Sequence, residues 1–389
     1  TIHTERHGFK PCLFSYKNCL EHRGIRYIFL ASTMTTYIST RGSDTPKSFE
    51  QVLLAGMASD GGLYVPQNWP KLPKLQSAPY AETAFAVMKP FVGDAIPDAD
   101  FKNIIAQTYS PQIFDHPSIT PLVQIADDLW IMEHFRGPTL AFKDVALQLL
   151  GRLFDYVLEK RGQRITIVGA TSGDTGSAAI EACKACKNID IFILHPKGRV
   201  SEVQRRQMTT SIAPNVHNIA MEGDFDNCQA MVKALFADEA FRNEVNLSAI
   251  NSINWARIMA QIVYYVTTSL ALGGPNRTIS YSVPTGNFGN VLAAYAAKQM
   301  GWNIGQLIVA SNRNDILTRF FESGSMALEK TRPSLSPSMD IQISSNFERV
   351  LFDLTGRDAA ALKTLMDDFK TTGRFTVPQA LLEAARVQF

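Results

Sequence analysis

From residue 143 onward, short runs rich in β-branched residues alternate with longer runs of helical character. Parallel strands need a long crossover connection, usually a helix, so this alternation indicates parallel β-α-β units. The predicted strands are 164–169, 189–195, 216–221, 278–283 and 307–310. The predicted helices are 177–187, one beginning after an N-cap at Ser201, and 225–241, 254–272, 291–300 and 315–322. The pattern predicts an α/β protein built on open parallel sheets.

A chain of 389 residues has room for two domains and an additional lobe. The breaker Gly273-Gly274-Pro275-Asn276 separates the two α/β series. The mostly helical stretch before Lys143 is punctuated by Pro66, Pro70, Pro73, Pro79 and Pro90. Residues 1–33 show no sustained period and are interpreted as a leader outside the fold. We therefore predict a leader 1–33, an N-terminal lobe 34–115, a larger cofactor-binding domain of 116–143 with 274–389, and a smaller α/β domain 144–273.

Charge and apolar run length argue against several classes of partner. Without residues 1–33, the chain has 33 basic and 34 acidic residues, so it lacks the basic surplus that a nucleic-acid binder uses against phosphates. No uninterrupted apolar stretch approaches the 18 residues of a membrane span. We expect a soluble, cytoplasmic protein, a monomer or homodimer, without nucleic-acid or membrane partners.

The five cysteines are too few and too scattered for a disulfide scaffold, which favours a reducing compartment. Cys183 and Cys186 form a lone CxxC in an Ala-rich helical setting, without a second pair. We interpret them as buried thiols and predict no metal site.

The first segment with chemical potential is Thr171-Ser172-Gly173-Asp174-Thr175-Gly176, between a predicted strand and helix. Ligands of α/β proteins bind at the carboxyl ends of strands, and amides at a helix N-terminus attract anions. The alternative is a plain turn in which Asp174 caps the helix.

The second segment is Pro284-Thr285-Gly286-Asn287-Phe288-Gly289-Asn290, again between a strand and a helix. Its glycines and asparagines allow the backbone to wrap an anion. It has neither the Lys-Ser/Thr ending of a Walker loop nor the third glycine of a dinucleotide fingerprint. A phosphate without an attached adenosine is the better prediction, and a structural Asn/Gly turn is the alternative.

The third segment is Phe142-Lys143-Asp144, preceded by Gly137-Pro138-Thr139-Leu140-Ala141. A lysine among apolar neighbours is partly desolvated, which lowers its pKa and suits it to form a Schiff base. By itself it could equally be a lysine that extends its ammonium to solvent. Together, the three segments supply an amine for an aldehyde, a loop for a phosphate and a loop for a carboxylate, as pyridoxal phosphate chemistry requires.

The region from Met34 to Phe389 resembles the threonine synthases of bacteria and fungi, which are fold-type II pyridoxal phosphate enzymes similar to the tryptophan synthase β subunit. Beyond the three segments above, the resemblance rests on Tyr37-Ile38-Ser39-Thr40-Arg41-Gly42, Asp60-Gly61-Gly62-Leu63-Tyr64-Val65-Pro66 and Asn251-Ser252-Ile253-Asn254-Trp255-Ala256-Arg257. Six matches in the family's order distinguish it from the serine dehydratases.

The resemblance implies a role for each segment. Lys143 would be the catalytic residue and form the Schiff base with the cofactor. Asp174 would lie near the phenolic oxygen of the cofactor, where related enzymes carry Asn. The residues expected to hold the cofactor phosphate are Gly286, Asn287, Phe288, Gly289 and Asn290. The residues expected to bind substrate are Thr171, Ser172, Gly173, Thr175 and Gly176 at the carboxylate, and Ser252, Asn254 and Arg257 at the leaving phosphate.

By the same resemblance, the reaction is the conversion of O-phospho-L-homoserine and water to L-threonine and phosphate, the last step of threonine biosynthesis. There are two alternatives. One is a different pyridoxal-phosphate-dependent lyase acting on a phosphorylated amino acid, and the other is a non-catalytic phosphate- or dinucleotide-binding α/β protein. The family pattern also includes an Asp-Pro-His-Thr stretch whose hydroxyl meets the pyridine nitrogen. No such run follows Leu335, so we expect weaker cofactor retention than in a full-length homologue.

Overall fold

The parallel sheet predicted for the middle of the chain is present in the computed structural model, which describes residues 35–389. Its four strands are all parallel, in the order β7-β6-β5-β8. The strands are β5 (Ile165–Ala170), β6 (Ile189–Pro196), β7 (Val216–Met221) and β8 (Leu247–Ser248). The helices of this region are α4 (Lys143–Arg161), α5 (Asp174–Cys183), α6 (Glu202–Thr209), α7 (Phe225–Ala237) and α8 (Glu239–Glu244). The interpretation of this region as α/β is confirmed.

Ser201 and Asp238 both cap helices of this region. Ser201 caps α6 by accepting from the amide of Gln204 at 3.4 Å, as predicted. The single helix predicted over 225–241 is wrong, because Asp238 leaves helical geometry and caps α8 by accepting from the amide of Phe241. Asp and Asn side chains compete with the helical backbone in this way, which makes them frequent boundaries.

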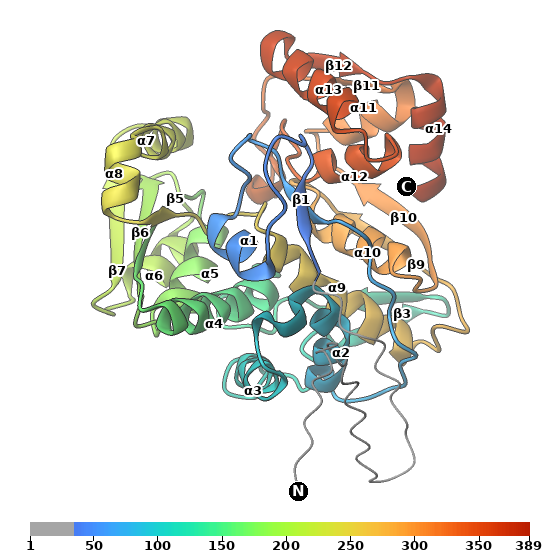
Figure 1. Cartoon of the computed structure of the whole chain (residues 1–389), viewed down its shortest axis with the longest axis horizontal. Coiled ribbons are helices and arrows are strands. Elements are labelled where there is room, and N and C mark those ends of the chain that lie inside the picture. Colours follow the sequence, from blue (N-terminus) through green and yellow to red (C-terminus); the bar gives the residue numbers. More distant parts are fainter. Residues whose placement is uncertain (1–34) are drawn as a thin grey trace, which may run out of the picture. The chain divides into compact units, whose positions relative to one another are not determined.

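The second α/β series contains one parallel pair of strands, β9 (Ile279–Pro284) and β10 (Ile304–Ala310), joined through α10 (Gly289–Gln299). The chain beyond it is helical with a short antiparallel pair. Its elements are α11 (Ile316–Ser323), β11 (Ser325–Ala327), η2 (Pro337–Met339), α12 (Phe347–Leu354), α13 (Ala359–Thr372), β12 (Arg374–Thr376) and α14 (Gln379–Gln388). In Figure 1 these helices gather in the orange and red part of the chain, where α12 contacts α10.

The region before α4 is less helical than predicted. It has three α-helices and a short 3-10 helix, but also two antiparallel strand pairs that the sequence analysis missed. Its elements are β1 (Tyr37–Ser39), α1 (Phe49–Ala55), β2 (Tyr64–Pro66), α2 (Tyr80–Val92), η1 (Gly93–Ala95), α3 (Asp98–Thr108), β3 (Leu122–Ala126) and β4 (Leu129–Met132). The predicted leader, 1–33, lies outside the described residues.

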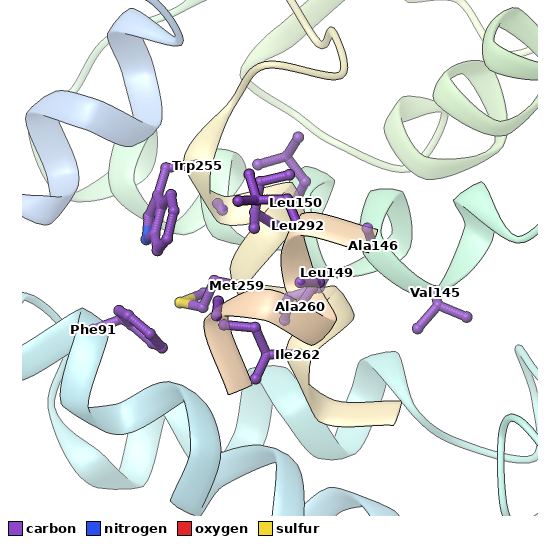
Figure 2. Packing of buried hydrophobic residues seen from close by; sticks show 14 of the residues in the cluster. Phe91, Val145, Ala146, Leu149, Leu150, Trp255, Met259, Ala260, Ile262 and Leu292 are labelled. Atoms are coloured by element: carbon purple, nitrogen blue, oxygen red, sulfur yellow. The ribbon is translucent and has the colours of Figure 1, made fainter. Parts of the chain in front are cut away.

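Helix α9 (Trp255–Ala271) occupies the centre of the core, where it packs against α2, α4 and α10. Figure 2 shows Trp255 and Met259 of this helix close to Phe91 of α2, with Leu292 of α10 nearby. Trp255 and Met259 are fully buried. Because α9 is enclosed on nearly all sides, any polar group on it needs a partner or a ligand.

Cys183, Cys186 and Cys228 are free and buried. Within residues 35–389, no helix combines the length and apolar character needed to cross a bilayer.

The close packing of α4 against α5 depends on the absence of a side chain at Gly151. A Cβ atom at this position would lie 2.5 Å from the carbonyl oxygen of Ala182. Helix propensity alone predicts that Gly151→Ala stabilises the protein by about 1 kcal/mol. We expect the clash to dominate and to lower the free energy of unfolding by about 1–3 kcal/mol in urea titrations. The exposed Glu159→Ala on α4 is the control, with a change within about 0.5 kcal/mol. A more stable Gly151→Ala protein would contradict the packing argument.

Candidate active site

Lys143 is the first residue of α4, and the loop before it is held by the next residue, Asp144. The buried carboxylate of Asp144 accepts from the amide of Thr139 at 2.8 Å and from its hydroxyl at 2.6 Å. Leu140 has a φ of 58°, a left-handed conformation that is rare for a branched side chain. Asp144 therefore holds a strained loop in place, and this loop sets the position of Lys143 at the start of α4.

The ammonium of Lys143 forms a buried ion pair with Asp174 at the start of α5. Asp174 also accepts from the hydroxyl of Ser338 at 2.6 Å and from the amide of Thr175 at 2.7 Å. The side chain of Asp174 does not cap α5, whose N-cap is Gly173, so the alternative of a simple capping role is wrong. Asp174 instead connects the lysine to the loop that contains Ser338.

Burial and neighbouring charges set the protonation of this pair. Desolvation lowers the pKa of Lys143 and the positive charge of Arg257 lowers it further, while Asp174 opposes both. Burial raises the pKa of Asp174, but Lys143, Ser338 and the Thr175 amide outweigh that effect and hold the pKa below its usual range. Asp174 is therefore an anion, and Lys143 is easier to deprotonate than an ordinary lysine.

The loop from Thr171 to Gly176 is shaped by the hydroxyl of Thr171, which accepts from the amides of Gly173 and Gly176. Gly173 has a φ of 142°, which only glycine adopts readily. The amides of Ser172 and Asp174 have no acceptor among the described residues. Two free amides beside a helix N-terminus suit a carboxylate.

The loop from Gly286 to Asn290 presents five consecutive backbone amides without an acceptor among residues 35–389. Its carbonyl groups are occupied elsewhere: Ser344 donates to the oxygen of Gly286 at 2.6 Å, and the side chain of Asn346 donates to that of Asn287 at 2.9 Å. Tied carbonyls and free amides at the start of α10 form a cup that suits an anion such as phosphate.

The tip of this cup is Phe288, which has a φ of 63°. Its side chain is buried between Phe347 and Phe389, with ring centroids 4.9 and 5.3 Å away. A left-handed aromatic residue is strained, and such strain persists where surrounding packing enforces it. The aromatic cluster therefore holds the cup in its anion-binding form.

The segment 337–341 brings the lysine and the cup together. Ser338 bonds Asp174, the partner of Lys143. A Cβ atom on Gly286 would lie 3.2 Å from Met339 Sδ and 2.9 Å from Ile341 Cδ1. The glycine lets the cup pack directly against the segment that reaches the lysine site.

Arg257 lies in the first turn of α9 and is 2% exposed. No hydrogen bond or ion pair of its guanidinium joins it to another described residue, and its Nε is buried without a partner. Burial lowers the pKa of Arg257 to about 10, although Asp174 opposes the effect. An unpartnered buried guanidinium is expensive, so an anionic ligand is its natural partner.

The other two residues predicted at the leaving phosphate differ from Arg257. Asn254 is the N-cap of α9: its oxygen accepts from Ala256 and its amide donates to the carbonyl of Leu53 at 2.8 Å. Both ends of the Asn254 side chain therefore already have one partner each, and its role at the leaving phosphate stays a prediction. Ser252 is partly buried next to the cup, with its carbonyl 4.0 Å from a Cβ placed on Gly289.

Several residues of the site escaped the sequence analysis. Ser338, Ser344 and Asn346 were not singled out, because nothing in the local sequence shows which side chain of the segment 333–346 reaches another segment. A second group could have been found: Arg257, Gln261, Tyr264 and Thr268 recur at helical spacing in an otherwise apolar run. Such a row of polar side chains along one face of a buried helix, here called the polar stripe, indicates a binding site.

Comparison with known proteins agrees with this geometry. Residues 36–109 match the family described as threonine synthase N terminus, and residues 113–367 match the pyridoxal-phosphate dependent enzyme family. The threonine synthase of Pseudomonas aeruginosa is 58% identical over 358 residues, which cover 91% of this chain and 76% of that protein. The chain belongs to the threonine synthase family.

Solved threonine synthases share the fold. The pyridoxal-phosphate-bound enzyme of Brucella melitensis has a TM-score of 0.89 at 53% identity, with 91% of this chain and 77% of that chain covered. The yeast enzyme has a TM-score of 0.85 at 42% identity, covering 92% and 75%. The fold is that of a fold-type II pyridoxal phosphate enzyme. The protein is a pyridoxal-phosphate-dependent lyase that functions as a threonine synthase.

The residues present fit this cofactor. Its phosphate would have the five free amides of residues 286–290, and its aldehyde would have the amine of Lys143. A threonine synthase with this arrangement needs no dinucleotide fingerprint, in agreement with the absence of that motif from the sequence.

The electrostatic balance at Lys143 predicts a pH dependence. The neutral amine attacks the aldehyde, so the rate of cofactor attachment to the cofactor-free protein should rise with pH and level off below the ordinary lysine pKa of about 10.4. Asp174 raises and Arg257 lowers the pKa of Lys143. The midpoint should therefore fall in Asp174→Asn and rise in Arg257→Met, as measured by stopped-flow absorbance.

Ser338→Ala is the control for this test, because it removes a hydrogen bond to Asp174 without removing a charge. Its midpoint should move less than that of Asp174→Asn. A higher midpoint in Asp174→Asn would contradict the assignment of Asp174 as the stabilising counter-ion.

Proposed function

We propose that the protein converts O-phospho-L-homoserine and water to L-threonine and inorganic phosphate. The observation that carries this proposal is the unpartnered, buried guanidinium of Arg257, whose charge acts on the amine of Lys143. A substrate with a carboxylate, an amine and a phosphate has a complementary group for each part of the site. The phosphate cup of residues 286–290 remains for the cofactor.

Binding would orient the substrate by its two anionic ends. The free amides of Ser172 and Asp174 would receive the carboxylate, with the hydroxyls of Ser172 and Thr175 beside them. Gly173 and Gly176 permit the turn, and Thr171 supports it from inside. Arg257 would receive the phosphate, which leaves as an anion and is stabilised by a charged donor.

Pyridoxal phosphate, when bound, acts as an electron sink for charge that develops at the α carbon of the substrate. Lys143 would take the protons from the α and β carbons, and protons would return to the γ carbon after phosphate leaves and to the α carbon after water adds. Asp174 would keep the lysine amine in place through the ion pair, with Ser338 and the Thr175 amide holding the carboxylate. Arg257 would hold the phosphate as it departs from the γ carbon, before water adds at the β carbon.

The division of the chain predicted from sequence supports the same arrangement. We propose that residues 144–273 form the smaller domain, that 116–143 with 274–389 form the larger cofactor-binding domain, and that 34–115 form the N-terminal lobe. The substrate loop and the cup would then belong to different domains, each at the carboxyl end of a parallel strand. The free thiols are also consistent with a cytoplasmic location.

Product analysis tests the reaction. The purified protein, supplied with pyridoxal phosphate and O-phospho-L-homoserine, should release one phosphate for each L-threonine formed. Borohydride reduction should fix the cofactor on Lys143, as detected by peptide mass. Release of phosphate with a keto acid and ammonia, but without threonine, would instead assign a different lyase.

The two buried arginines provide a matched test of the phosphate site. Arg349 is also fully buried, but it donates to the carbonyls of Tyr64 and Ile253 and to the side chain of Asn346. Arg257→Met should leave the melting temperature unchanged or higher, because it removes an unpartnered charge, and should lower kcat/KM about 100-fold.

Arg349→Met should show the opposite pattern. Its thermal stability should fall clearly, because three acceptors lose their donor, and its kcat/KM should fall less than that of Arg257→Met. The measurements are thermal unfolding and steady-state kinetics on both variants. A large loss of stability in Arg257→Met, with kcat/KM preserved, would show that Arg257 has a structural role.

A further inference from the structure

Two neighbouring tyrosines of α9 meet one side chain of the phosphate cup. The carboxamide oxygen of Asn290, in the first turn of α10, accepts from the hydroxyl of Tyr265 at 2.7 Å and also from that of Tyr264. Both tyrosines are buried, at 0% and 1% exposure. Two phenols from one helix therefore converge on a single amide oxygen.

Their packing leaves these phenols little freedom. The ring of Tyr264 lies 4.8 Å from that of Tyr265 and 4.5 Å from the edge-on ring of His134. Tyr265 also packs edge to face with Tyr281 at 4.8 Å. Burial raises the pKa of both phenols, so both keep their protons and remain donors.

This contact determines how the amide of Asn290 is used. A carboxamide has one oxygen that accepts and one NH2 group that donates. Because the hydroxyls occupy the oxygen, the NH2 group is turned away from them, and it has no acceptor among the described residues. The backbone amide of Asn290, in the same residue, belongs to the cup.

We propose that Tyr264 and Tyr265 are positioning residues that orient the side-chain NH2 of Asn290 as a donor to the cofactor phosphate. The inference rests on the proposed phosphate cup and adds a side-chain donor to its backbone amides. Tyr265 carries the sharper prediction, because Asn290 is the one acceptor of its hydroxyl within the described part of the chain. The hydroxyl of Tyr264 is shared with Gln261 at 3.1 Å.

The test compares two ligands that differ only in the phosphate. Affinities of the cofactor-free protein for pyridoxal phosphate and for pyridoxal are measured by equilibrium dialysis. Tyr265→Phe should weaken pyridoxal phosphate about fivefold, the effect of one hydrogen bond, and the double variant Tyr264→Phe/Tyr265→Phe should weaken it further. Pyridoxal affinity should stay within about twofold, because without a phosphate the orientation of Asn290 does not matter.

Tyr281→Phe is the matched control. Its hydroxyl lies in the same cluster and donates to the backbone of Tyr265 at 3.0 Å, but it does not contact Asn290. It should leave both affinities unchanged. In an Asn290→Ala background, Tyr265→Phe should have no further effect, since the residue that it positions is gone.

The outcomes separate this inference from the proposed function. Equal weakening of both ligands by Tyr265→Phe, no weakening at all, or an undiminished effect in Asn290→Ala would overturn the positioning role. If the wild-type protein itself binds pyridoxal as tightly as pyridoxal phosphate, the cup assignment fails, and the inference fails with it. A normal wild-type preference with no tyrosine effect leaves the proposed function intact and rejects only the inference.

Discussion

The carboxylate of Asp174 accepts hydrogen bonds from Lys143, Ser338 and the amide of Thr175, and these three donors come from separate parts of the site. Desolvating an ammonium and a carboxylate is unfavourable by several kcal/mol for each ion unless each has partners. Three donors on one carboxylate meet that requirement. Replacing Asp174 would therefore affect the lysine, the substrate loop and the segment that packs on the cup at once.

The two ends of the site solve the problem of binding anions differently. The cup at residues 286–290 uses neutral backbone amides, which become available because Ser344 and Asn346 occupy neighbouring carbonyl groups. Arg257 uses a full charge that has no hydrogen-bond or ion-pair partner among residues 35–389. A cofactor phosphate that stays bound is suited to a rigid neutral cup, whereas a leaving phosphate gains more from a charged donor at the moment of bond cleavage.

The sequence predicted the parallel α/β architecture and the three motif segments, because strand-to-helix junctions with glycine have a local signature. It did not predict the contact between Ser338 and Asp174, which are 164 residues apart. Nor did it predict that Asn254, assigned to the substrate, is the N-cap of α9. A local sequence pattern identifies a strand-to-helix junction. The partner of each side chain depends on tertiary packing, which cannot be read from a local periodicity.

Helix α9 explains how the protein tolerates so many buried polar groups. A guanidinium without a partner destabilises the fold by at least about 1–3 kcal/mol. On the same helix, Trp255, Met259 and Ile262 are fully buried, and each apolar side chain of this size contributes about 1.5–3 kcal/mol. Their packing against α2, α4 and α10 offsets the polar stripe. The functional residues can therefore lie on the most enclosed helix, where water is excluded and each charge or hydrogen bond acts with greater strength.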